Sequence, residues 1–224
     1  MYNKIRITVA SLLIMTLCAL SSTATLSYFT DTDAATNEFT IGNASTTLSI
    51  YEDENSTEFN ASHHSPVVKD IPFYLSAENT GNIPVYQRFR VVIPIELASV
   101  VTPDLLGSAC DDIATNENKS CSNDDYTVTY DDSVEVGTAT YAEYYITSKT
   151  ALGVNAKTKN WPMTKLKIST QVGELSDIQK SLLTCENGSD NNCKLGIKVY
   201  SDAIQTAGFT DAVSAFANFT EKYD

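Results

Sequence analysis

Apolar and polar residues alternate along most of this 224-residue chain. A period of two is typical of half-buried β-strands. Segments with this pattern lie at 39–41, 48–50, 71–77, 89–97, 126–130, 144–146, 166–168 and 195–199. Pro94, inside one of these segments, predicts a bulge or an edge strand there. We therefore predict an all-β fold, an antiparallel β-sandwich or jelly roll of about eight strands.

Helical patterns are few and short. Ser176 and Gln179 have the spacing of a capping box, and Thr210 is a candidate N-cap near the end of the chain. The apolar faces of the two expected helices would consist of Leu175, Ile178 and Leu182, and of Val213, Phe216 and Ala217. We expect these helices to be minor elements of a β-domain.

The longest apolar run stands near the N-terminus, from Ile7 to Leu20, behind Lys4 and Arg6. Small residues at 21–24 follow it, and the whole segment is typical of an export signal. The run is shorter than the roughly 20 apolar residues that span a bilayer. We predict a signal peptide at 1–27, cleaved between 24 and 28, and a single domain at 28–224 that is secreted to the matrix or cell surface without a membrane anchor.

The chain is acidic, with a formal net charge of −13. Both basic residues of the leader, Lys4 and Arg6, would leave with it, so the mature chain is more acidic still. Such a charge disfavours nucleic acid and anionic lipid as partners. It indicates either solubility through repulsion or assembly tuned by calcium at acidic loops.

Four cysteines remain after Cys18 leaves with the leader. They form two local pairs, Cys110/Cys121 and Cys185/Cys193, each around a polar loop. An even number of cysteines in an exported chain indicates disulfides, and four allow three connectivities. Short loop closure favours the local pairing. Zinc is the alternative, but these spacings lack the close pairs typical of zinc sites.

The sequence shows no catalytic constellation. It has neither an H-E-x-x-H motif nor a G-x-S-x-G turn. The only histidines, His63 and His64, are adjacent and would point to opposite sides of an extended chain. The acidic pairs at 111–112, 124–125 and 131–132 fit solvated loops or calcium ligation. We therefore predict no catalytic residue, no metal site and no cofactor, with calcium as the open alternative.

Asn-x-Ser/Thr sequons are glycosylation candidates if the source organism modifies exported proteins. They begin at Asn43, Asn55, Asn60, Asn118, Asn187 and Asn218.

Two short motifs follow the leader. Tyr28-Phe29-Thr30-Asp31 stands at the expected cleavage point, and Asn37-Glu38-Phe39-Thr40-Ile41-Gly42 comes soon after. This arrangement resembles the N-terminus of the TasA/camelysin family, exported proteins matured by a SipW-type signal peptidase. The segment at 69–82 and the tail at 199–209 are also similar to that family, whereas the middle of the chain matches poorly.

The resemblance implies a jelly-roll-like domain that polymerises into extracellular or biofilm-matrix fibres. The partners would be a SipW-type signal peptidase and further copies of the chain. In that arrangement the N-terminal strand of one subunit pairs with the sheet of the next, head to tail. Alternate side chains of the donor segment 28–42, Tyr28, Phe29, Phe39 and Ile41, would fill pockets in the acceptor. The alternative is that Phe39 and Ile41 belong to a strand of their own domain.

This chain departs from the family in two respects, since familiar members are rich in lysine and largely free of cysteine. The family also includes a protein labelled a metalloendopeptidase, which leaves a secreted peptidase as an alternative function. A monomeric surface binding module is another. No residue of this chain matches a zinc-protease motif, so no catalytic residue is assigned.

Overall fold

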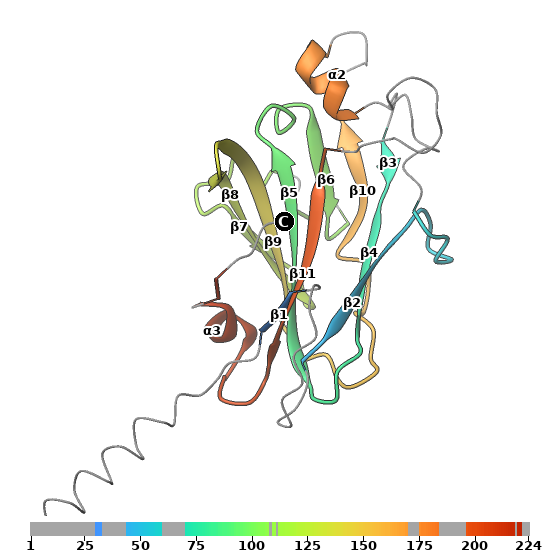
Figure 1. Ribbon diagram of the computed structural model, residues 1–224, viewed down its shortest axis with the longest axis vertical. Helices are drawn as coiled ribbons and strands as arrows, with labels where there is room; N and C mark the ends of the chain where they lie inside the picture. Colours follow the sequence, from blue (N-terminus) through green and yellow to red (C-terminus); the bar gives the residue numbers. More distant parts are fainter. Residues whose placement is uncertain are drawn as a thin grey trace, which may run out of the picture.

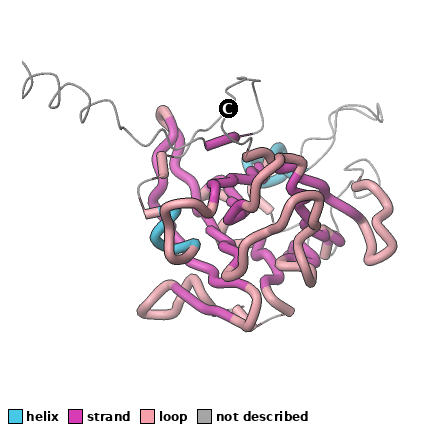
Figure 2. The backbone as a smooth tube through the Cα atoms, turned by 90° about the horizontal axis from the view of Figure 1, so that it is seen from below, coloured by secondary structure: helices cyan, strands magenta, loops and turns pink. Residues whose placement is uncertain are grey.

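Eleven strands and two short helices make up most of the described part of the chain, which confirms the all-β prediction. The structure is a computed structural model that describes residues 30–32, 44–59, 70–107, 109–110, 112–169, 175–183, 196–217 and 219–220. The strands form antiparallel sheets in a sandwich-like arrangement (Figure 1). Seen from below, they surround a common interior (Figure 2).

The larger sheet has six strands in the spatial order β1-β11-β5-β9-β8-β7. In that order they are β1 (Thr30–Thr32), β11 (Lys198–Gln205), β5 (Val85–Pro94), β9 (Ala139–Ser148), β8 (Tyr126–Val136) and β7 (Ser120–Ser122). Each neighbouring pair is antiparallel. Segments from both ends of the described chain therefore meet at the β1–β11 edge.

The facing layer is built from two smaller sheets. One contains β3 (Ile71–Pro72), β10 (Met163–Ile168) and β6 (Val101–Leu105), and the other contains β2 (Thr46–Tyr51) and β4 (Tyr74–Asn79). Phe73, between β3 and β4, donates its backbone N–H to the carbonyl of Thr164 in β10. This hydrogen bond connects the two small sheets at the residue between β3, which pairs with β10, and β4, which pairs with β2.

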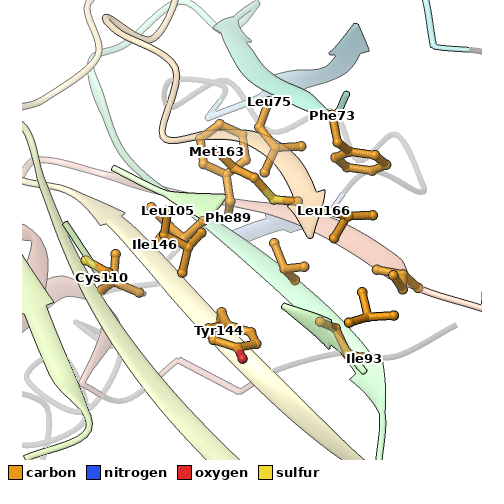
Figure 3. Close-up of a cluster of buried hydrophobic side chains, with 14 of the residues drawn as sticks. Phe73, Leu75, Phe89, Ile93, Leu105, Cys110, Tyr144, Ile146, Met163 and Leu166 are labelled. Carbon is orange, nitrogen blue, oxygen red and sulfur yellow. The ribbon is translucent and has the colours of Figure 1, made fainter. Parts of the chain in front are cut away.

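The core lies between the two layers (Figure 3). Phe89, Val91 and Ile93 of β5 are fully buried against residues of the facing layer, including Leu75 and Leu166. The period of two therefore identified these three core positions correctly, although the other face of β5 is buried too and carries Arg88, Arg90 and the apolar Val92. Burial of each large aliphatic side chain contributes about 1.5–3 kcal/mol to folding.

The environment of Pro94 differs from the expectation. Strand β5 lies between β11 and β9 rather than at the edge of the sheet, and it ends at Pro94. Proline lacks the N–H that a continuing ladder requires, so the chain leaves the sheet there. Ile95 is 38% exposed, and Leu97 returns to the core from the turn that follows.

The two helices occur where the sequence predicts them, but the residues that they bury differ from the predicted apolar faces. The capping box of Ser176 and Gln179 is present at the start of α2 (Asp177–Leu183), yet Ile178 is 60% exposed. Helix α3 (Ala212–Phe216) is capped by Asp211 instead of Thr210, since the Asp211 carboxylate accepts the N–H of Ser214. Its buried residues are Ala212, Ala215 and Phe216, whereas Val213 is exposed.

Candidate functional site

The candidate site is the edge of the larger sheet at β11. Strand β1 pairs with it in antiparallel register, with Thr30 opposite Ile204, Asp31 opposite Ala203 and Thr32 opposite Asp202. β1 is only three residues long, whereas β11 has eight. Figure 1 shows β1 alongside the lower part of β11. The predicted donor residues that flank β1, Tyr28, Phe29, Phe39 and Ile41, lie outside the described residues.

The chain begins its main fold close to the same edge. Ala44, at the start of the described segment 44–59, is 2% exposed and belongs to one apolar cluster with Val85, Leu152 and Ala203. Two residues later, Thr46 shares a hydrogen bond of 3.0 Å with Ser201 of β11. The first residues described after β1, Ala44 and Thr46, therefore lie beside β11, the strand with which β1 pairs.

A buried network of charged groups holds β11 to β5. The carboxylate of Asp202 accepts hydrogen bonds from Arg90 Nε at 2.7 Å and from Arg88 Nη2 at 3.0 Å. Arg90 Nη1 also lies 3.4 Å from Glu143 Oε1 on β9. Arg90, Asp202 and Glu143 have no exposed surface. Buried charges are costly unless they are paired, and here two arginines face two carboxylates.

Aromatic rings cover this network on the outer face of the sheet. The guanidinium of Arg88 lies 4.5 Å from the ring centroid of Phe216 in α3 and 4.9 Å from that of Phe219. Arg90 lies 4.6 Å from the ring centroid of Tyr200. Cation–π contacts of this kind add to the ion pairs where water is excluded. Helix α3 and the network together hold β11 from the outer face of the sheet.

Sequence reasoning missed this network, although the chain contains a signal for it. Arg88 and Arg90 alternate with Phe89 and Val91 in a strongly apolar strand. Two arginines at alternate positions of a central strand require acidic partners on neighbouring strands. Which carboxylates supply them depends on the pairing of β5 with β11 and β9, which the sequence alone does not reveal.

The opposite edge of the sheet is unsuited to pairing. β7 covers only residues 127–129 of β8, and the β8–β9 register shifts between Asp131 and Val134. Asp131, Asp132 and Glu135 are at the surface there. Lys119 Nζ lies 2.9 Å from Asp132, and this hydrogen bond lowers the pKa of the Asp132 carboxyl. Bulges and charged residues are common means of blocking edge-to-edge association.

Cys110 and Cys121 are joined by a disulfide, the local pairing predicted for these two residues. Cys110 is 3% exposed within the main core. The bond ties β7 at the acidic edge to the loop after β6. The second predicted pair, Cys185 and Cys193, lies outside the described residues.

The remaining candidate residues do not converge on a reactive centre. Asn55 and Asn118 are exposed in turns, whereas Asn43, Asn60, Asn187 and Asn218 lie outside the described residues, as do His63 and His64. In the described part of the chain, no three His, Cys, Asp or Glu side chains are grouped to hold a metal ion. None of its helices is long and apolar enough to cross a membrane.

No family model, curated protein or solved structure matches this chain.

Proposed function

We propose that this chain is a secreted structural subunit of extracellular fibres, in a biofilm matrix or on the cell surface. Subunits would join head to tail, the N-terminal strand of one adding to β11 of the next. The observation that carries the proposal is the pairing of Thr30–Thr32 with the β11 edge. The resemblance of the flanking motifs to the TasA/camelysin family supports the same assembly.

The small size of this pairing favours exchange between copies. A backbone hydrogen bond contributes a net 0.5–1.5 kcal/mol, roughly, so a three-residue strand adds little to the stability of its own domain. The same β11 edge can accept the same residues from another molecule without any new type of contact. Because the donor and the acceptor are different surfaces, successive additions build an open filament when the rotation between subunits does not close a ring.

The two sheet edges give such a filament its polarity. The β11 edge accepts a strand, while the bulged and acidic β8 edge resists one. Addition would therefore take place at one edge of each subunit, and side-by-side merging through β8 would be suppressed.

Disulfide trapping distinguishes exchange from pairing within one molecule. Asp31 and Ala203 are opposite each other, and Cα atoms of paired residues lie within the range that a disulfide can bridge. We expect mature Asp31→Cys and Ala203→Cys proteins, mixed and oxidised, to form covalent dimers. The Asp31→Cys/Ala203→Cys double variant should form covalent ladders that coincide with fibres in electron micrographs.

Each single variant oxidised alone is the control for disulfides formed with the native cysteines. If the mixture gives no dimers and the double variant closes within one chain, the strand pairs only in its own domain. That result would overturn the fibre proposal.

A further inference from the structure

An aromatic surface, formed by Tyr51, Tyr74 and Trp161, lies on the sheet of β2 and β4. Tyr51 and Tyr74 are opposite each other on these strands, and the indole of Trp161, in the loop before β10, packs against both rings. All three side chains are half-buried. Their neighbours Ile50 and Leu75 belong to the core, so the two tyrosines lie on the other face of the sheet, away from the interior. Strand addition at β11 does not involve this aromatic surface.

The geometry of the three rings is compatible with a bound cation. The ring centroids of Tyr51 and Trp161 are 5.8 Å apart with an interplanar angle of 77°, and those of Tyr74 and Trp161 are 5.5 Å apart with an angle of 83°. Rings that are nearly perpendicular can direct their π faces toward one bound group, and ammonium groups are bound in this way through cation–π contacts. The same faces can stack on the apolar C–H face of a sugar ring.

Carboxylates lie beside the aromatic surface. Glu58 is opposite Tyr51 on the side away from β4, so Glu58, Tyr51 and Tyr74 form one row on the same face. The Glu58 side chain is exposed and has no ion pair within the described part of the chain. Asp53 fixes the intervening turn, because its carboxylate accepts hydrogen bonds from within that turn. Residues 52–58 contain four acidic residues and no basic one, so the charge beside the rings attracts a cation.

Two features favour a polysaccharide over a peptide as the cation. Tyr51 is paired on both sides, with Tyr74 and with Glu58, so the aromatic surface has no free strand edge to which a peptide could add. The next row on the same face contains Ser49 opposite Ser76, and the half-buried hydroxyl of Ser49 can hydrogen-bond to a sugar hydroxyl. The formal net charge of −13 disfavours an anionic polymer.

We propose that the aromatic surface and Glu58 together bind a cationic amino-sugar polymer. The rings contact a sugar face and the ammonium group that it carries, and the Glu58 carboxylate pairs with that ammonium group. The site lies within one subunit, so a monomer binds the polymer and the proposal does not depend on fibre formation.

The test uses the fluorescence of Trp161, which is the only tryptophan of the chain. In a mildly acidic buffer, glucosamine is protonated and the carboxylates stay ionised. We expect chitosan hexasaccharide to change the emission of the mature monomer in a saturable way. The fully acetylated chitin hexasaccharide has no ammonium group and should bind about tenfold more weakly or worse. Calorimetric titration at the same ionic strength checks both affinities.

Three variants test the residues of the site. Glu58→Gln and Tyr74→Ala should each weaken chitosan binding about threefold to tenfold, because each removes one contact with the ammonium group. Tyr74→Phe keeps the ring and should bind within about twofold of the wild type. Glu135→Gln makes the same charge change as Glu58→Gln at an exposed position of β8, and is the matched control. It should also leave the affinity within about twofold of the wild type. Thermal unfolding checks that each variant is folded.

Four results would overturn the proposal. Equal affinity for chitin and chitosan would show that the ammonium group is not recognised. Hexalysine bound as tightly as chitosan would indicate a basic peptide instead. Equal weakening by Glu58→Gln and Glu135→Gln would indicate attraction to the net charge alone. The absence of both a fluorescence change and heat with chitosan would show that there is no site. None of these results bears on strand addition, which the disulfide trapping tests separately.

Discussion

At the scale of single residues, Asp202 stabilises strand β11. Its carboxylate holds two arginines of β5, and its backbone is opposite Thr32 of the docked strand. Removal of one member of a buried ion pair is expensive because the other charge stays buried without compensation. The residue is therefore important to both the fold and the docking edge.

We expect Asp202→Asn to lower the free energy of unfolding by about 3–5 kcal/mol, measured by chemical denaturation. Asp70→Asn is the matched control, since its partner Lys165 lies 3.4 Å away and both side chains are partly exposed. That substitution should cost less than about 1 kcal/mol. Equal losses for the two variants would contradict the structural role of the buried network.

At the scale of elements, β8 is tied to the loop that precedes β10. The hydroxyl of Tyr126 donates to the carbonyl of Lys159 in that loop. Burial, with a smaller effect from Asp125, raises the pKa of the Tyr126 phenol well above its ordinary value. This contact connects the six-stranded sheet to the facing layer through one side chain.

The raised pKa predicts how stability changes at alkaline pH. The phenol ionises near pH 10 in the unfolded chain and only above that in the folded one. Its contribution is therefore complete below pH 10 and is lost as the pH rises beyond it. Tyr126→Phe should lose about 1 kcal/mol near neutral pH and show a shallower decline above pH 10. Urea unfolding from pH 7 to 11 measures both effects. If the free energy of unfolding falls equally steeply with pH in the two proteins, the buried Tyr126 phenol is not the cause of the decline.

At the scale of the whole molecule, the length of chain between β1 and Ala44 limits the geometry of the proposed fibre. Ala44 lies in the same apolar cluster as Ala203 of β11. The segment from Thr32 to Ala44 is about 12 residues and spans at most about 43 Å when fully extended.

If β1 of one subunit pairs with β11 of the next, we expect an axial repeat no greater than about 50 Å per subunit, because Ala44 and β11 lie close together in each subunit and the linking segment sets the distance between neighbours. Layer spacing in fibre images measures this repeat. Inserting six glycine or serine residues between 33 and 43 should relax the limit while fibres persist. A repeat far above 50 Å in the unmodified fibre would show that a different surface carries the contact.

The sequence by itself determined the β class, most of the strands and the local disulfide of Cys110, since these depend on residue alternation and short-range spacing. It was less accurate for the C-terminal strand and for α3, because Ala203, Ile204 and Ala215 gain their burial from distant partners.

Only the tertiary structure decided which charges pair and which strand covers each edge of the larger sheet. Those properties depend on the order of strands in the sheet, and period-two alternation is the same for every order. Alternation therefore reveals which face of a strand is buried, but not which strand lies beside it.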